Sequence, residues 1–165
     1  MSGIARLKMF LGGAQSPRQP QHEEWAGSSG KPRVLIENPD RAELWAHEEI
    51  LREAGYEVAS CVGPTAAGVR GAEHTACPLL TEGHCHLVAS ADVVVSTTSL
   101  GDSHAILAKL SARLAPRLVV EGTTAELDRA GDAIGEAVEV VQPVTPETLL
   151  AAVAAALPDQ AAVQV

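Results

Sequence analysis

Aromatic residues are almost absent from this chain of 165 residues. They make up 2% of it, as Phe10, Trp25, Trp45 and Tyr56. Because hydrophobic residues still account for 46%, a buried core must be built from Val, Leu, Ile and Ala. That composition is typical of a parallel sheet covered by helices rich in Ala and Leu.

Long apolar runs are lacking as well. No stretch approaches the roughly 18–20 apolar residues that span a bilayer, and residues 1–13 contain charges and glycines in place of the apolar centre of a secretion signal. We therefore expect a cytoplasmic protein that makes no contact with a membrane.

Basic charge is scarce. The chain has 12 Lys and Arg against 21 Asp and Glu, which gives a net charge of −9. Residues 1–31 carry four basic and two acidic groups, so the remaining residues 32–165 carry eight basic and nineteen acidic groups. Nucleic-acid binding needs a basic surface to face the phosphates. The acidic body excludes nucleic acid as a partner.

Composition also divides the chain into three parts. Residues 1–31 are rich in Gly, Ser, Pro and Gln and bury too little apolar surface to offset the entropy of ordering, which predicts a disordered leader. Residues 32–158 are long enough for one domain, and residues 159–165 are expected to form a flexible tail.

Apolar runs typical of buried strands alternate with helical patterns through this domain. We expect strands over residues 33–37, 56–62, 92–95, 117–120 and 138–141. Helices are expected from Asp40 to Gly55 and over 103–114, 126–135 and 146–157, with a short helix ending within 87–91. The alternation predicts an α/β domain with a doubly wound, flavodoxin-like, five-stranded parallel sheet. Residues 37–38, 96–99, 121–124 and 142–143 should meet at the carboxyl ends of the strands, where such sheets bind ligands.

Three segments resemble the receiver domain of bacterial two-component response regulators. They are VLIENPDR at 34–41, EAGYEV at 53–58 and VQPVTPETLL at 141–150, and their order and spacing extend the resemblance over residues 33–157. The resemblance implies a receiver fold with Mg²⁺ held by an acidic pair after the first strand. It also implies a phosphoacceptor Asp ending the third strand, a Ser or Thr after the fourth, and a Lys before the proline that follows the fifth.

Matched onto these positions, most of the implied chemistry is missing. Glu37 stands for one member of the acidic pair and Ile36 for the other, while Thr97 or Ser96 occupies the place of the phosphoacceptor. Residues 121–123 cover the Ser or Thr position, and Gln142 replaces the Lys. The degenerate pocket is expected to contain Glu37, Asn38, Ser96, Thr97, Thr123 and Gln142.

The substitutions exclude phosphorylation of the aspartyl type. A hydroxyl is a poor nucleophile at neutral pH without a base, and a single carboxylate provides too few ligands for a Mg²⁺ site. We therefore expect a pseudo-receiver with no catalytic residue and no cofactor, acting as a signalling module through a protein partner or self-association. Residues 139–150, where receivers often dimerise, are the expected interface.

One cluster has no counterpart in receivers. His74, Cys77, His84, Cys85 and His86 fall within thirteen residues between the second and third strands. Three interpretations stay open: the cysteines pack as small apolar side chains, Cys77 and Cys85 form a reversible disulfide that senses redox state, or thiolates and imidazoles bind a metal such as Zn²⁺. Cys61, in the second strand, is expected in the core.

The hydroxyl-rich turn at 96–99 offers a further alternative. It leads into an expected helix whose first amides are suited to an anion, although the Lys and glycine pattern of a phosphate-binding loop is missing. A small-ligand site at this turn is therefore a third hypothesis.

Overall fold

The computed structural model describes residues 25, 30–63, 77–97, 110 and 117–157. Within them, five strands form one sheet, in which every neighbouring pair is parallel and the order is β2-β1-β3-β4-β5. The strands are β1 (Arg33–Glu37), β2 (Glu57–Cys61), β3 (Val93–Thr97), β4 (Leu118–Gly122) and β5 (Val138–Val141). The expected doubly wound, flavodoxin-like sheet is confirmed.

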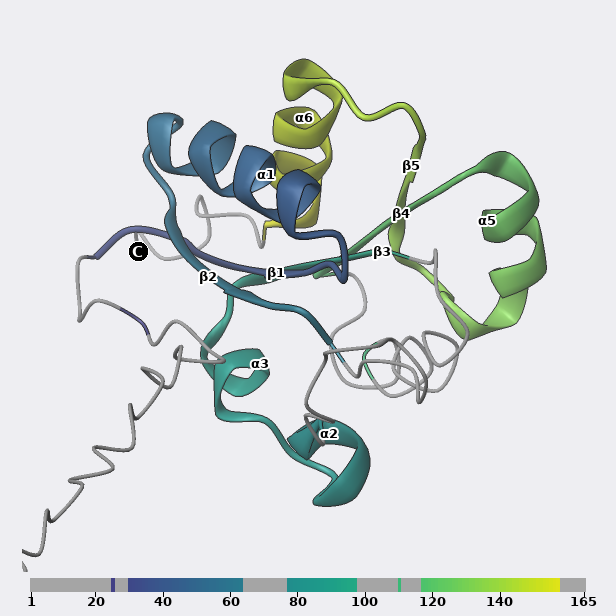
Figure 1. Cartoon of the computed structure of the whole chain (residues 1–165), viewed down its shortest axis with the longest axis horizontal. Helices are drawn as coiled ribbons and strands as arrows, with labels where there is room; N and C mark the ends of the chain where they lie inside the picture. The colour runs from purple at the N-terminus through teal and green to yellow at the C-terminus, as the bar shows by residue number, and fades with distance from the viewer. Residues whose placement is uncertain (1–24, 26–29, 64–76, 98–109, 111–116, 158–165) are drawn as a thin grey trace, which may run out of the picture.

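Helices cover both faces of this sheet (Figure 1). Helices α1 (Arg41–Glu53) and α6 (Pro146–Ala156) lie side by side on one face, which we call the α1/α6 face. The opposite face, the α2/α3/α5 face, carries α2 (Pro78–Thr81), α3 (His86–Ser90) and α5 (Thr124–Ala130), which is followed by a 3-10 turn over Gly131–Ala133. None of the described helices is long and apolar enough to cross a membrane.

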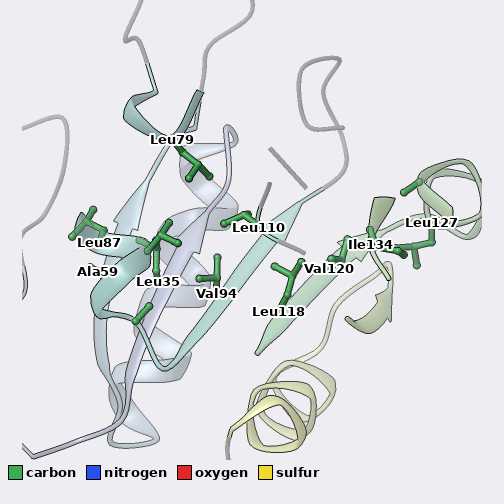
Figure 2. Close-up of a cluster of buried hydrophobic side chains, with 13 residues drawn as sticks. Leu35, Ala59, Leu79, Leu87, Val94, Leu110, Leu118, Val120, Leu127 and Ile134 are labelled. Carbon is green, nitrogen blue, oxygen red and sulfur yellow. The ribbon is translucent and has the colours of Figure 1, made fainter. Parts of the chain in front are cut away.

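Two apolar clusters fill the space between the sheet and these helices. Because successive side chains of a strand point to opposite faces of the sheet, the strands contribute residues to both clusters. Leu35 and Val94 belong to the cluster on the α2/α3/α5 face, where Figure 2 shows them with Leu79, Leu87 and Leu118. Val34 and Val95 belong to the other cluster, which packs against α1 and α6. The central strands β1, β3 and β4 are therefore buried on both faces, as their continuous apolar runs predict.

Several element boundaries differ from those expected. β3 extends to Thr97 because its last two residues continue the ladder with the neighbouring strands, Ser96 opposite Glu37 and Thr97 opposite Glu121. Helix α5 begins at Thr124 because Thr123 and Glu126 form a capping box. α2 lies where only a loop was expected, with Pro78 in its first turn.

The two ends of α1 illustrate how the sequence sets local structure. Asp40 caps the helix by accepting hydrogen bonds from the amides of Ala42 and Glu43. The Asp40–Glu43 spacing suggests a capping box, but the Glu43 carboxylate instead accepts a hydrogen bond from Asn38 Nδ2 at 3.0 Å. Gly55, expected just after the helix, has φ +94°, a conformation that glycine adopts without strain.

Some expectations concern residues that lie outside the described part of the chain. These are most of the leader at 1–31, the tail at 159–165, and the helix at 103–114, of which only Leu110 is described, as a buried helical residue. Within the leader range, Trp25 packs against the cluster on the α2/α3/α5 face, and the Arg33 guanidinium lies over its ring, 5.5 Å from the centroid.

Candidate functional site

The carboxyl edge of the sheet gathers an unusual number of buried polar side chains. Asn38, Ser96, Thr97 and Glu121 are each no more than 1% exposed, and Glu37 is 7% exposed. Alternation along the strands separates the two carboxyl groups: Glu37 shares its side of β1 with Leu35, and Glu121 shares its side of β4 with Val119. The edge therefore offers two distinct groupings, one on each face of the sheet.

The first grouping joins the ends of β1 and β3 on the α2/α3/α5 face. Ser96 Oγ donates a hydrogen bond of 2.5 Å to Glu37 Oε2. Burial raises the pKa of Glu37 to about 7, and the Ser96 hydrogen bond opposes that shift. Near neutral pH this carboxyl group is therefore present in both protonation states, and its partner is a neutral hydroxyl.

Cys61, the last residue of β2, and Gly63, in the loop after it, lie next to Glu37. Gly63 has φ +67°, and a Cβ there would collide with Glu37 Oε1. Cys61 lies opposite Glu37 in the β1–β2 ladder. The pKa of the Cys61 thiol is raised to about 12, first by burial and then by the Glu37 charge. The thiolate of Cys61 is therefore strongly disfavoured at neutral pH.

The second grouping joins α1 to β4 on the α1/α6 face. Glu43, His47 and Glu121 each place one ligand atom within 4.8 Å of the others, and His47 Nδ1 lies 3.6 Å from Glu121 Oε2. Burial raises the pKa of Glu121 to about 8, with the Glu43 charge adding to the shift. Burial also lowers the pKa of His47, and the negative charge of Glu43 partly opposes this shift. The imidazole is accordingly neutral at pH 7.

Asn38 fixes the outer part of this second grouping. Its Nδ2 donates to Glu43 Oε2, and its Oδ1 accepts from the Asp40 amide at 2.8 Å. Both polar atoms of the buried Asn38 amide are thereby used within the turn that leads from β1 into α1. The Glu43 carboxylate is held toward the sheet as a result.

The expected pocket residues are thus only partly brought together. Glu37 and Ser96 are in contact, whereas Asn38 bonds to Glu43 and Thr97 pairs with Glu121, so these two belong to the grouping on the opposite face. Thr123 is exposed and is engaged in the α5 capping box. Gln142 follows β5, three strand spacings or roughly 14 Å from β1, so it lies far from Glu37.

Sequence reasoning missed the pairing of His47 with Glu121. The signal was available in part, because Glu43 and His47 are four residues apart and so share one face of a helix. What the sequence did not show is that this face turns toward the end of β4. His47 is buried, whereas Trp45 on the same helix is 65% exposed.

The cysteine and histidine cluster is described in part. Cys77 and Cys85 immediately precede α2 and α3, are half-buried, and pack against the core cluster of the α2/α3/α5 face. His84 and His86 are exposed, and His74 lies outside the described residues. All three cysteines carry free thiols. Among the residues that the structure describes, Glu43, His47 and Glu121 form the metal-competent group, so a site in the cysteine and histidine segment remains a prediction.

The hydroxyl-rich turn is described only at its start. Ser96 and Thr97 are the last residues of β3, whereas residues 98 and 99 lie outside the described part. A small-ligand site there also remains a prediction.

Comparisons with known proteins concern the fold. No protein-family model matches the chain, and no curated protein matches it. Solved structures do match. The chemotaxis protein CheY4 of Vibrio cholerae is 19% identical, with 77% of this chain and 99% of that chain covered and a TM-score of 0.55.

Two further structures give the same picture. A response regulator receiver domain from Clostridium thermocellum is 21% identical, with 76% of this chain and 93% of that chain covered and a TM-score of 0.55. A two-component response regulator from Clostridium difficile is 16% identical over 76% of this chain and 95% of that one, with a TM-score of 0.54. The chain therefore has the receiver fold that the resemblance implied.

Proposed function

We propose that this chain is a signalling module with the receiver fold that takes no phosphoryl group on an aspartate and acts through protein contacts. One observation carries the proposal. The end of β3, where the resemblance places the phosphoacceptor, holds the buried hydroxyls of Ser96 and Thr97, and the Ser96 hydroxyl is bound to Glu37.

The chemistry of aspartyl phosphorylation explains why this matters. A carboxylate oxygen must attack phosphorus while a divalent cation balances the phosphoryl charge. On the α2/α3/α5 face the carboxylate beside β3 is Glu37, which is buried, has its pKa raised to about 7, and is enclosed by Ser96 and Gly63. Such a group is poorly suited to attack a phosphodonor from solution.

The test is exposure of the full chain to acetyl phosphate and Mg²⁺, followed by intact mass measurement. We expect no added phosphoryl group, while an active receiver treated in parallel gains one that hydroxylamine removes. A hydroxylamine-labile phosphoryl group on this chain would overturn the proposal.

The surface we propose for the protein contact is the exposed side of β5. Glu139 and Val141 are exposed there, Val141 by 52%. Leu149, within the interface expected over residues 139–150, is fully buried and so belongs to the core. Contacts through this region would therefore use β5 and the exposed residues that begin α6.

Sedimentation measures this contact. Glu139→Arg and Val141→Glu are expected to weaken self-association or partner binding, whereas Glu53→Arg, an equal charge change at the exposed end of α1, should leave it unchanged. If Glu139→Arg and Glu53→Arg behave alike, β5 is not the interface.

A second candidate function is redox sensing by Cys77 and Cys85. The observation that favours it is that Cys61, Cys77 and Cys85 all pack against the apolar cluster on the α2/α3/α5 face. A peroxide would take two electrons and two protons from the Cys77 and Cys85 thiols, forming one disulfide, and would itself be reduced to water or an alcohol.

Counting free thiols before and after mild peroxide tests this second candidate. The function predicts a loss of two thiols that dithiothreitol reverses and that Cys77→Ser prevents, while Cys61→Ser leaves it intact. An unchanged thiol count would exclude the disulfide.

A further inference from the structure

Three potential metal ligands converge where helix α1 crosses the end of β4. Glu43 and His47 are one helical turn apart on α1, and Glu121 is the fourth residue of β4. One ligand atom from each lies within 4.8 Å of the other two. His47 is 5% exposed and Glu121 1% exposed, so solvent covers little of this group.

The buried imidazole is the feature that points to a ligand. His47 Nδ1 makes no hydrogen bond with any residue that the structure describes, although buried polar atoms are nearly always paired because leaving them unpaired costs free energy. Its nearest carboxylate oxygen, Glu121 Oε2, is 3.6 Å away, which is too far for a hydrogen bond.

That separation matches two ligands of a single ion. Zn²⁺ binds imidazole nitrogen and carboxylate oxygen at about 2.0–2.2 Å, and two ligands of a tetrahedral ion are then roughly 3.4 Å apart. The third group is already positioned, because Asn38 Nδ2 holds Glu43 Oε2 at 3.0 Å and leaves Oε1 for the ion. Such a bond to a ligating carboxylate orients it for the metal.

We propose that Glu43, His47 and Glu121 form a binding site for a divalent cation of the zinc class. One imidazole and two carboxylates suit borderline cations such as Zn²⁺, whereas Mg²⁺ prefers oxygen ligands only. Binding of the ion displaces the proton of the Glu121 carboxyl group, and the two ionised carboxylates then balance the charge of the ion. By joining α1 to β4, the ion stabilises the contact between the helix and the sheet.

This site differs from the others considered for the chain. The Mg²⁺ site implied by the resemblance depends on Glu37, which lies on the opposite face of the sheet. The cysteine and histidine segment lies between β2 and β3, and none of its described residues belongs to this group. The proposal is also independent of whether the chain acts as a pseudo-receiver, because it rests on ligands from α1 and β4 and on the Asn38 bond that positions one of them.

The experiment uses the full chain, purified without a histidine tag and stripped with a chelator. Zn²⁺ alone is titrated by calorimetry, and thermal unfolding is followed with Zn²⁺ or Mg²⁺. We expect one Zn²⁺ per chain and a melting temperature that rises with Zn²⁺ but not with equal Mg²⁺, because a ligand that binds only the native state stabilises it.

Variants assign the ligands. Glu43→Gln keeps the oxygen that Asn38 contacts and lies on the half-buried start of α1, so we expect it to fold and to bind Zn²⁺ at least about tenfold more weakly. His47→Gln should have the same effect. His86→Gln, an exposed histidine of the other segment, and the double variant Cys77→Ser with Cys85→Ser should bind as the unaltered chain does.

Co²⁺ gives a readout that does not depend on stability. Bound at this site it should show weak d–d bands and no thiolate-to-metal charge-transfer band. The proposal is overturned if Glu43→Gln binds Zn²⁺ as tightly as the unaltered chain. It is equally overturned if the Co²⁺ spectrum shows thiolate ligation that disappears in the double cysteine variant.

Discussion

Glu37 and Glu121 are both buried at the carboxyl edge of the sheet, and they lie on opposite faces of it, with β3 between their strands. The last two residues of β3 follow the same division. Ser96 pairs in register with Glu37, and Thr97 pairs in register with Glu121. Polar groups that the receiver resemblance implies for one pocket are here distributed over two.

The buried state of Glu37 predicts how stability depends on pH. Its pKa in the folded chain is about 7 against an ordinary 4.5, so between these values the folded state retains a proton that the unfolded chain has lost. Its contribution to stability is therefore complete below pH 4.5 and is lost as the pH rises toward 7. At about 1.4 kcal/mol per pKa unit, the loss is on the order of 3 kcal/mol.

Glu37→Gln removes this ionisation and retains an acceptor for Ser96. Urea unfolding between pH 4.5 and 8 should therefore show a smaller fall in the free energy of unfolding, with the remaining fall due to Glu121. Glu126→Gln is a control, because bonds from Thr123 lower the pKa of Glu126, so this carboxylate is ionised in both the folded and the unfolded chain over most of this range and its removal should leave the pH dependence unchanged. Parallel pH profiles for Glu37→Gln and the unaltered chain would show that Glu37 is not buried in this way.

Gly63 is required both by its positive φ and by its close approach to Glu37, whereas Gly83 shares only the positive φ. Both glycines have positive φ, +67° and +74°, but a Cβ at Gly63 meets the Glu37 carboxylate, whereas at Gly83 nothing lies within 4 Å. Gly83→Ala should cost about 1 kcal/mol for the backbone strain alone. Gly63→Ala should lower the stability measured by thermal unfolding by more than Gly83→Ala does. When Glu37 is also replaced by Ala, the Gly63→Ala substitution should lower stability only by the amount due to backbone strain.

The α5 capping box gives a local test of helix energetics. Thr123 Oγ1 accepts from the Glu126 amide, and the Glu126 carboxylate accepts from the Thr123 amide at 2.8 Å. Thr123→Ala should lower the free energy of unfolding by about 1 kcal/mol. Thr124→Ala, one residue further along and equally exposed, should change it by less than about 0.5 kcal/mol.

Leu149 and Val141 separate the core from the proposed contact surface. Leu149→Ala should destabilise the chain by about 2–5 kcal/mol, because a fully buried leucine leaves a cavity. Val141→Ala removes an exposed side chain and should alter stability by no more than about 0.5 kcal/mol. Chemical unfolding at one pH measures both. Similar losses in the two variants would show that β5 is covered in the folded chain.

The strands and their parallel arrangement in one sheet follow closely from the sequence. Continuous apolar runs such as residues 33–37 are stable only between two layers of helices, and their alternation with helical patterns leaves few topologies. The boundary at the end of β3 could not be predicted, because ladder bonds to β1 and β4 draw the polar Ser96 and Thr97 into the strand. Only pairing partners decide that, and they are distant in sequence.

The candidate site was harder to predict for a different reason. Periodicity shows which residues share a helix face but not how far the helix is rotated against the sheet. From periodicity alone, adjacent carboxylates such as Glu48 and Glu49 are expected on a solvated helix face, and the surroundings of His47 stay undetermined. In the structure Glu48 is buried and paired with Arg52 at 2.8 Å. The hydrogen bond between Asn38 and Glu43, which are only five residues apart, likewise replaces the capping box that the Asp40–Glu43 spacing suggests.

The contact between Trp25 and Arg33 affects any attempt to study the domain in isolation. Trp25 covers part of the apolar cluster under the α2/α3/α5 helices, and residue 25 precedes the expected domain boundary at residue 31. A shortened chain beginning at residue 32 would lack this indole ring and would expose apolar surface of the cluster to solvent beside the first strand. Aggregation of such a fragment would then reflect the truncation and would be no guide to how the intact protein associates.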